Sequence, residues 1–393
     1  MTPAARVQAA VEILDEVIAA ARGGGAAADT IVSRYFAARR YAGSKDRRAV
    51  REHVYRAVRA WPELPASGRE AMLGLAAGDP PLAALFDGSP HGPAPATEMR
   101  PPPAATAVPA WLVSRLDPIL SQDEWPSLLT RAPLDLRVNR LRGSRDEALA
   151  ALPLAAPTPL SPLGLRLPEG SRVEEEPAWN SGMVEIQDEG SQLLALACTA
   201  NAGMIVIDLC AGAGGKTLAL AAEMRNEGRL IASDTDRGRL SRMKPRLARA
   251  GVSIAEPRLL DPGREREALA ELAGQADLVL VDAPCSGTGT WRRNPELRWR
   301  LTPERLERLV KLQAYLLDLA VELVRPGGVL VYAVCSLVAE EGRGQAEALS
   351  GRSSMVPEEV PSPAGRAAGS GLILSPAHED TDGFFVARWR APC

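Results

Sequence analysis

From about residue 183 to its end, the chain alternates short apolar runs with segments of helical periodicity. The runs cover residues 205–209, 230–233, 259–260, 278–281 and 329–334. Short apolar strands separated by helices are typical of βαβ units, so we expect an α/β fold with a parallel sheet covered by helices on both faces. Two later apolar segments, 372–374 and 384–389, predict a strand pair that runs antiparallel at the sheet edge.

The first part of the chain has helical periodicity only. Apolar residues fall on one face of two segments, at Val7, Val11, Leu14, Val17 and Ile18 and again at Val50, Val54, Ala57 and Val58. We therefore expect a small helical domain over residues 1–87. Residues 88–109 are rich in Pro, Ala and Gly, and a composition of this kind cannot continue a helix and stiffens toward polyproline II. This stretch is interpreted as a linker.

Between the linker and the alternating region the pattern is mixed. A helix is predicted at 111–120, and strands are predicted at 134–141 and 164–167. Together they indicate a small α/β subdomain over residues 110–182. The remaining residues, 183–393, form the largest predicted domain and carry the motifs.

The composition predicts a globular, cytoplasmic protein without a membrane partner. No apolar run reaches the roughly 18 residues of a membrane helix, and the N-terminal segment is amphipathic and carries acids, unlike a signal peptide. The net charge of -3 gives no affinity for nucleic acid by itself, so RNA contacts must come from local arginine clusters. Each cluster is explained equally well as a solvated helix face; the clusters lie at 34–59, 131–145, 237–249 and 292–311.

Thiols and carboxylates are the side chains available for chemistry. The five cysteines show neither C-x-x-C spacing nor a paired framework, which argues against a disulfide scaffold and a metal site. The three histidines, His53, His91 and His378, lie outside the motifs, so no histidine-based triad or metal centre is expected. Cys198, in an apolar helical segment, and Cys393, at the C-terminal end, are interpreted as structural.

A glycine-rich turn, VIDLCAGAGGKT over 206–217, connects a buried strand to a helix. Such a turn lets a ligand approach the backbone amides at the helix N-terminus. A Walker A loop would need glycine where Cys210 stands, and a dinucleotide fingerprint would need glycine or alanine at Thr217. The remaining interpretation is the donor loop of a class I methyltransferase. In that case Asp208 ends the strand, and Asp234, at the end of the next strand, binds the ribose hydroxyls of S-adenosylmethionine.

Two further cysteines follow the last apolar residues of buried strands. In DLVLVDAPCSGTGT (277–290) the strand ends at Asp282 and Cys285 follows, and in VLVYAVCSL (329–337) the strand ends at Cys335. In a doubly wound sheet, ligands bind at the carboxyl ends of the strands. We therefore expect both thiols and Asp282 to face one crevice together with the glycine loop.

Two thiols beside a methyl donor point to methylation of carbon 5 of cytosine. This carbon is too weak a nucleophile to attack a sulfonium methyl group until a thiolate has added to carbon 6 of the ring. The pKa of that thiol must be lowered locally. An acid such as Asp282, bonded to the edge of the base, would stabilise the developing charge.

Together these motifs resemble the NOL1/NOP2/Sun family of RNA cytosine-C5 methyltransferases, and most closely its bacterial Sun branch, which acts on small-subunit ribosomal RNA. The likeness covers about 111–389 and extends to the segments EIQDEGSQL, RRNPELRW, RPGG and DGFFVARW. It implies a class I, Rossmann-like fold with a mixed seven-stranded sheet, S-adenosyl-L-methionine as cofactor, 16S ribosomal RNA as substrate and a monomer. The segment KDRRAVREHVYR (45–56) is similar to the NusB-type RNA-binding domain of this branch.

The resemblance also implies roles for individual residues. The cysteine of the last motif is the family's nucleophile, here Cys335, and the cysteine after Asp-Ala-Pro, here Cys285, assists product release. Asp282 and Lys216 complete the implied catalytic set. The implied donor contacts are Cys210, Ala211, Gly212, Ala213, Gly214, Gly215, Lys216, Asp234, Asp261 and Asp282.

The sequence departs from the family pattern at two places. Gly212 and Ala213 replace the stiffer Ala-Pro pair that is usual in the donor loop, and we expect binding to persist. Tyr-Ala-Val-Cys-Ser replaces the commoner Ser-Thr-Cys-Ser, which leaves Cys335 in place. Three alternatives stay open: methylation of transfer RNA, methylation of DNA or protein, and a non-catalytic RNA-binding ribosome-assembly factor. The presence of both cysteines argues against the last.

Overall fold

The computed structural model describes residues 1–96, 98–102 and 107–393. These residues form two compact units. Unit 1 comprises Met1–Leu116, Leu120–Thr130 and Thr290–Pro303, and unit 2 comprises Asp117–Ile119, Arg131–Gly289 and Glu304–Cys393. Part of the predicted linker, Thr97 and residues 103–106, lies outside the described residues. The predicted division into four segments stays a prediction.

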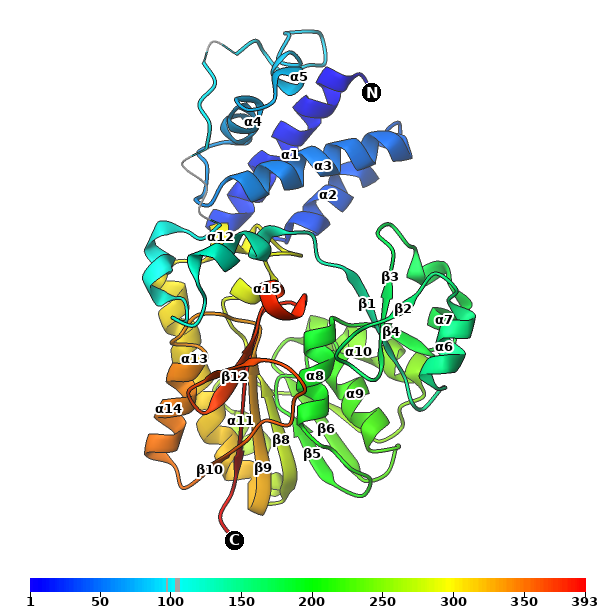
Figure 1. Ribbon diagram of the computed structural model, residues 1–393, viewed down its shortest axis with the longest axis vertical. Helices are drawn as coiled ribbons and strands as arrows, with labels where there is room; N and C mark the ends of the chain where they lie inside the picture. Colours follow the sequence, from blue (N-terminus) through cyan, green and yellow to red (C-terminus); the bar gives the residue numbers. More distant parts are fainter. Residues whose placement is uncertain (97, 103–106) are drawn as a thin grey trace. The chain divides into compact units, whose positions relative to one another are not determined.

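Unit 1 is helical, and its first helices run from blue to cyan in Figure 1. The first helix packs against the next three, and the series is α1 (Pro3–Gly23), α2 (Ala28–Ala37), α3 (Ser44–Ala60), α4 (Gly68–Ala76) and α5 (Pro80–Ala83). The hydroxyl of Thr2 caps the start of α1, and Gly24, in the left-handed conformation, ends it. The apolar faces that the periodicity predicts for α1 and α3 are buried in one core.

The helix predicted over 111–120 is wrong in type and length. The chain forms a 3-10 helix, η1 (Ala110–Arg115), and Leu116 is already extended. Pro118 disfavours helical backbone at the residue before it, which explains the early end. A second 3-10 helix, η2 (Gln122–Leu129), follows.

The arginine-rich segment after Gly289 is a packing element of unit 1. Arg298, on α12 (Leu297–Arg300), is 2% exposed and donates to the carbonyl oxygens of Val58 (2.6 Å) and Ala107 (2.9 Å). Burial lowers the pKa of Arg298 to about 10, so the guanidinium stays charged at neutral pH. Arg298 is thus neither on a solvated face nor at an RNA-contacting surface, the two interpretations that the sequence left open for its cluster.

Unit 2 contains a nine-stranded mixed sheet in the order β11-β12-β13-β9-β8-β5-β6-β7, with β10 paired to β13. Parallel pairing joins β5 (Ile205–Asp208), β6 (Arg229–Asp234), β7 (Ala255–Leu259), β8 (Ala276–Asp282) and β9 (Val324–Val334). The antiparallel strands are β10 (Val356–Glu358), β11 (Arg366–Ala368), β12 (Gly371–Leu374) and β13 (Phe384–Arg390). Without the three-residue strands β10 and β11, the sheet is the expected seven-stranded one. The last strand lies between β9 and β12 rather than at the edge.

Helices pack on this sheet. The helix α9 (Gly215–Glu223) contacts β6, and α10 (Arg237–Ala250) contacts both β6 and β7 (Figure 1). The helix α8 (Glu189–Ala197), which precedes β5, contacts α9 and β13. Further helices in the same part of the chain are α11 (Glu265–Ala268), α13 (Pro303–Leu323), α14 (Arg343–Arg352) and α15 (Pro376–Glu379), with the 3-10 turns η4 (Ala270–Leu272) and η5 (Thr288–Thr290).

A second, small sheet belongs to unit 2. Its order is β2-β3-β1-β4, with β1 (Leu134–Val138), β2 (Ala156–Pro157), β3 (Gly164–Leu167) and β4 (Val184–Ile186), all antiparallel. The helices α6 (Arg145–Ala151) and α7 (Pro177–Asn180) and the turn η3 (Val173–Glu175) accompany it. Leu136, Leu165 and Val184 pack in its core. The strand predicted at 134–141 ends at Val138 because the chain turns at Asn139, whose carbonyl accepts from Arg142.

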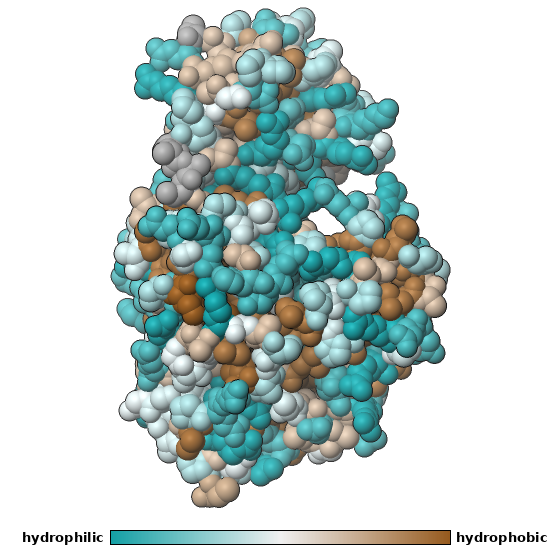
Figure 2. All heavy atoms as spheres, viewed as in Figure 1, coloured by the Kyte–Doolittle hydropathy of each residue, from teal (hydrophilic) through white to brown (hydrophobic). Residues whose placement is uncertain are grey.

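Within the described part of the chain, no helix is both long and apolar enough to cross a membrane. Figure 2 shows a viewed face on which apolar patches are separated by hydrophilic side chains.

Candidate active site

The glycine loop joins β5 to α9 and starts at a buried acid. Asp208 is fully buried, and its Oδ2 atom accepts a hydrogen bond from the hydroxyl of Thr217 at 2.7 Å. Its Oδ1 atom has no hydrogen-bond partner among the described residues. Burial raises the pKa of Asp208 to about 7. The strand end therefore carries a carboxyl group with an unused polar atom, as expected of a site that receives a polar ligand.

The loop is shaped by glycines in the left-handed region. Gly212 and Gly214 have φ angles of 56° and 88°. The backbone N–H of Gly212 donates to Oδ2 of Asp234 at 2.8 Å, so the loop and the end of β6 are joined directly. Asp236, two residues further on, caps α10. A Cβ atom added at Gly215 would meet nothing within 4 Å, which leaves open space over the loop backbone.

Arginines of α10 hold the loop at the positions where the sequence departs from the family pattern. Arg246 donates from Nη1 to the carbonyl oxygen of Ala213 at 2.8 Å and pairs through Nη2 with Glu185 at 3.0 Å. The guanidinium carbon of Arg239 lies 3.3 Å from the place that a Cβ atom at Gly212 would take. Both departing positions of the loop therefore lie against arginines of α10.

Lys216 and Asp282 form an ion pair between the first turn of α9 and the end of β8. The distance from Nζ to Oδ2 is 2.7 Å, and the lysine side chain is 9% exposed. Burial alone would lower the pKa of Lys216, but the carboxylate of Asp282 raises it above its ordinary value. Lys216 is therefore a fixed positive charge at the carboxyl end of the sheet.

The two predicted cysteines lie side by side. The sulfur atoms of Cys285 and Cys335 are 3.3 Å apart, and both side chains are partly exposed. The hydrogen bond to Cys335, together with burial, raises the pKa of Cys285 well above its ordinary value. Cys285 is thus held as a neutral thiol next to the other sulfur.

Each thiol is carried by a loop that follows a strand: the first thiol loop, 283–289, follows β8, and the second thiol loop, 335–341, follows β9. A backbone hydrogen bond from Gly289 N to Cys335 O at 3.1 Å ties the two loops together, and one from Gly383 N to Gly289 O at 2.8 Å ties the first loop to the stretch before β13. A Cβ atom at Gly289 would lie 1.9 Å from the carbonyl oxygen of Gly383, so this crossing requires glycine.

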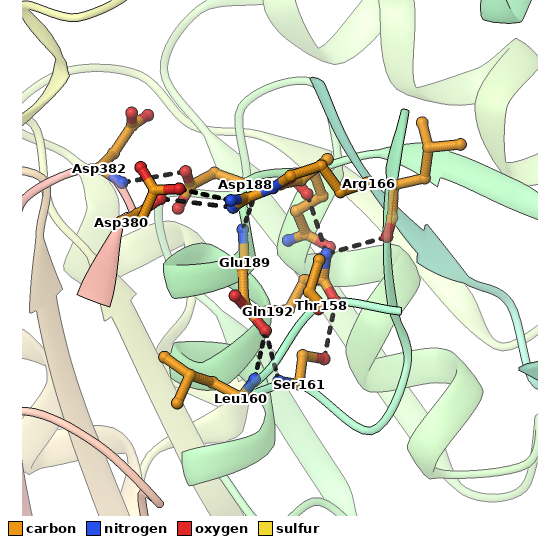
Figure 3. Close-up of polar contacts among 12 residues, drawn as sticks. Thr158, Leu160, Ser161, Arg166, Asp188, Glu189, Gln192, Asp380 and Asp382 are labelled. Atoms are coloured by element: carbon orange, nitrogen blue, oxygen red, sulfur yellow. Dashed lines mark hydrogen bonds and ion pairs between the residues drawn. The ribbon is translucent and has the colours of Figure 1, made fainter. Parts of the chain in front are cut away.

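The EIQDEGSQL segment connects the small sheet to the chain just before β13. Figure 3 shows Arg166 of β3 reaching Asp380, with Asp188 and Asp382 beside this ion pair. Asp188 caps α8 and also accepts from the backbone N–H of Asp382 at 2.9 Å. The same stretch before β13 contacts the first thiol loop through its backbone. Asp188 is therefore linked to the first thiol loop through the backbone of Asp382 and Gly383.

Three other residues that the sequence analysis singled out, Asp261, Cys210 and Cys198, lie outside the pair of thiols and the Lys216–Asp282 ion pair. Asp261 is exposed just beyond β7, and its side chain has no hydrogen bond or ion pair to another described residue. Burial raises the pKa of Cys210 well above its ordinary value, which suits a backbone contact rather than a reactive thiol. Burial raises the pKa of Cys198 to about 12, as expected of a structural cysteine.

Sequence analysis missed the polar residues behind the two thiols. Glu341, on the second thiol loop, is fully buried and accepts hydrogen bonds from Ser286 and Ser336. Gln313 of α13 donates to the same carboxylate at 2.9 Å. The available signal was the serine that directly follows each cysteine of the two motifs.

The mixed sheet and the loop between β5 and α9 define a class I methyltransferase. The family model 16S rRNA methyltransferase RsmB/F matches residues 194–390, about half of the chain. The chain belongs to this family, which depends on S-adenosylmethionine.

Individual relatives agree with this assignment. Ribosomal RNA small subunit methyltransferase B of Salmonella typhi is 36% identical over 290 residues, 71% of this chain and 65% of that protein. The chain thus spans less than two thirds of the length of that relative. The crystal structure of PH0851 has the same fold, with a TM-score of 0.78, 23% identity and 99% of both chains covered. A methyltransferase homolog protein from Pyrococcus horikoshii has a TM-score of 0.61 and 27% identity, over 69% of this chain and 90% of that one.

Proposed function

We propose that the chain is an S-adenosylmethionine-dependent RNA cytosine-C5 methyltransferase that acts on 16S ribosomal RNA through a covalent adduct with Cys335. The observation that carries the proposal is the 3.3 Å separation of the sulfur atoms of Cys285 and Cys335. Addition to the ring needs one thiol, and removal of the enzyme from the product benefits from a second acid or base at the same place.

The donor is held by the glycine loop and the two acids that flank it. Asp234 receives the ribose hydroxyls, and the loop backbone at Gly215, where the structure leaves open space, receives the methionine part. The carboxyl of Asp208 secures the turn through Thr217. Bound there, S-adenosylmethionine supplies an electrophilic methyl group.

The chain's own residues prepare the base. The sulfur of Cys335 forms a bond to carbon 6 of cytosine, which makes carbon 5 nucleophilic. Asp282 orients and hydrogen-bonds the edge of the base, and Lys216 fixes this carboxylate. After methylation, carbon 5 loses its proton, the bond from carbon 6 to sulfur breaks, and the aromatic ring is restored. Cys285, a neutral thiol in contact with Cys335, assists that elimination.

A labelled methyl donor tests the proposal directly. We expect label from S-adenosylmethionine to enter RNA and neither DNA nor protein, and Cys335→Ala to lose it by at least about 100-fold. Cys393→Ala, which changes an exposed cysteine, is the matched control and should keep wild-type activity. Label in DNA or protein, or full activity of Cys335→Ala, would overturn the proposal.

The identity of the RNA is a separate part of the proposal. The Salmonella relatives are named for the small ribosomal subunit RNA, and the helices of unit 1 are proposed to bind RNA as a NusB-like domain. Bisulfite sequencing of total RNA from a deletion strain should show one lost 5-methylcytosine in 16S ribosomal RNA. A site lost from transfer RNA instead would favour the second candidate function.

A further inference from the structure

A buried carboxylate lies between the two thiol loops. Glu341 has no exposed surface, and four hydrogen bonds converge on it. Its Oε1 atom accepts from the backbone N–H of Ser286 at 2.8 Å and from Nε2 of Gln313 at 2.9 Å. Its Oε2 atom accepts from the hydroxyls of Ser286 and Ser336, the latter at 2.5 Å. Four donors match the acceptor capacity of an ionised carboxylate, whose hydrogen bonds are stronger than those of neutral groups.

The two serines that donate to Glu341 are the sequence neighbours of the two cysteines. Ser286 directly follows Cys285, and Ser336 directly follows Cys335. The backbone N–H that Glu341 accepts from is part of the peptide that joins Cys285 to Ser286. A shift of either serine therefore moves the neighbouring sulfur.

Other hydrogen bonds brace the same frame. Gln313 also donates to the carbonyl oxygen of Pro284 at 2.9 Å, so the first thiol loop is held on both sides of its cysteine. The hydroxyl of Thr288 accepts from the backbone N–H of Leu337 at 2.8 Å, which joins the first loop to the second. Glu341 is the one group among these that bonds to both loops and to α13 at once.

We propose that Glu341 is a positioning residue that sets the separation of the Cys285 and Cys335 sulfur atoms. Among the described residues no lysine or arginine pairs with Glu341, so its buried charge depends on the donors of the two loops. Because one carboxylate accepts hydrogen bonds from both loops, these bonds hold the two loops together. The consequence for catalysis rests on the proposed function, but the geometry can be measured without RNA.

Formation of a disulfide between the two thiols measures their separation. Diamide accepts the two electrons and two protons that the thiols lose as the sulfur–sulfur bond forms, and the linked peptides are followed by mass spectrometry. Glu341→Gln keeps the side-chain shape but replaces an acceptor oxygen by an NH₂ group that faces other donors. We expect the bond to form at least about 10-fold more slowly than in the wild type, because a buried donor is left unsatisfied and the loops separate.

Glu347→Gln is the matched control, since Glu347 is exposed on α14. It should react at the wild-type rate. Ser336→Ala removes one donor and keeps the carboxylate, so the rate of disulfide formation should decrease less than in Glu341→Gln. If Glu341→Gln does not fold, the rate in Ser336→Ala decides the question. A wild-type rate in a folded Glu341→Gln, or in Ser336→Ala where Glu341→Gln cannot be made, overturns the proposal.

Kinetics separate positioning from donor binding. With RNA and S-adenosylmethionine, Glu341→Gln should lower kcat by about 10- to 100-fold and leave the KM for the donor unchanged. A raised donor KM at constant kcat would contradict the role. If the wild type transfers no methyl label to RNA and Cys285→Ala forms no RNA adduct, while disulfide formation still depends on Glu341, the proposed function fails and the positioning role stands.

Discussion

At the residue scale, Asp208 is a carboxyl group whose ionised form is disfavoured by the fold. It is fully buried at the end of β5, and the largest cause of its raised pKa, about 7, is burial. A raised pKa in the folded state means that the group favours folding below its unfolded pKa of about 3.9 and loses this contribution as pH rises through 7. The donor loop is therefore anchored at the cost of some stability at neutral pH.

Asp208→Asn should remove this pH dependence. The amide oxygen of asparagine still accepts the hydrogen bond of Thr217, but the group no longer ionises. Between pH 5 and pH 8 we expect the free energy of unfolding of the wild type to fall, relative to the variant, by on the order of 2 kcal/mol. Urea unfolding at the two pH values measures it, and a difference that does not change with pH would contradict the argument.

At the element scale, the apolar runs predicted β5, β6, β8 and β9 because buried strands need continuous apolar residues on both faces. The run at 259–260 shares only Leu259 with β7, which reads AEPRL and is only partly buried. The position of β13 between β9 and β12 depends on tertiary pairing, which leaves no local signal. The short strands β2 and β10 each contain a proline and few apolar residues, so periodicity could not find them. The glycine loop was found from its motif, whereas its bracing by Arg246 required coordinates.

Arg246→Ala should weaken donor binding through this loop. Without the hydrogen bond to the carbonyl of Ala213, the loop loses its anchor on α10, and we expect the Kd for S-adenosylmethionine to rise by about 10-fold or more, as the loss of one charge-assisted hydrogen bond predicts. Isothermal titration calorimetry measures this. Arg242→Ala, an exposed arginine of the same helix, should bind as the wild type does. Equal affinities for the wild type and Arg246→Ala would show that the hydrogen bond from Arg246 to the loop does not support donor binding.

At the scale of the whole molecule, the sequence located both thiols but not what holds them. Cys285 and Cys335 stand after strands that the pattern revealed, and parallel strands end at the same edge. Glu341 carries no motif signal, because its donors come from three segments: Ser336 of its own loop, Ser286 of the first thiol loop and Gln313 of α13. The sequence could not tell whether the arginines of 292–311 are solvated or contact RNA, because the burial of Arg298 depends on packing within the folded unit.

Two arginines of unit 1 should separate stability from RNA binding. Arg298→Ala leaves buried carbonyl oxygens without their donor and should lower the unfolding free energy by about 2–3 kcal/mol. Arg48→Glu, on the exposed face of α3, should leave the Tm unchanged but raise the KM for RNA several-fold and weaken its salt dependence. Thermal unfolding and RNA titration at two salt concentrations test the pair. An unchanged KM in Arg48→Glu would place the RNA elsewhere.

The measurement that tests the central claim most directly is a search for a covalent RNA adduct with Cys285→Ala. If Cys335 adds to the base and Cys285 assists its release, this variant should accumulate a protein–RNA complex that survives denaturing electrophoresis and needs S-adenosylmethionine. The complex should be absent from the double variant Cys285→Ala/Cys335→Ala. A Cys285→Ala protein that turns over freely without an adduct, or an adduct that persists without Cys335, would contradict the account.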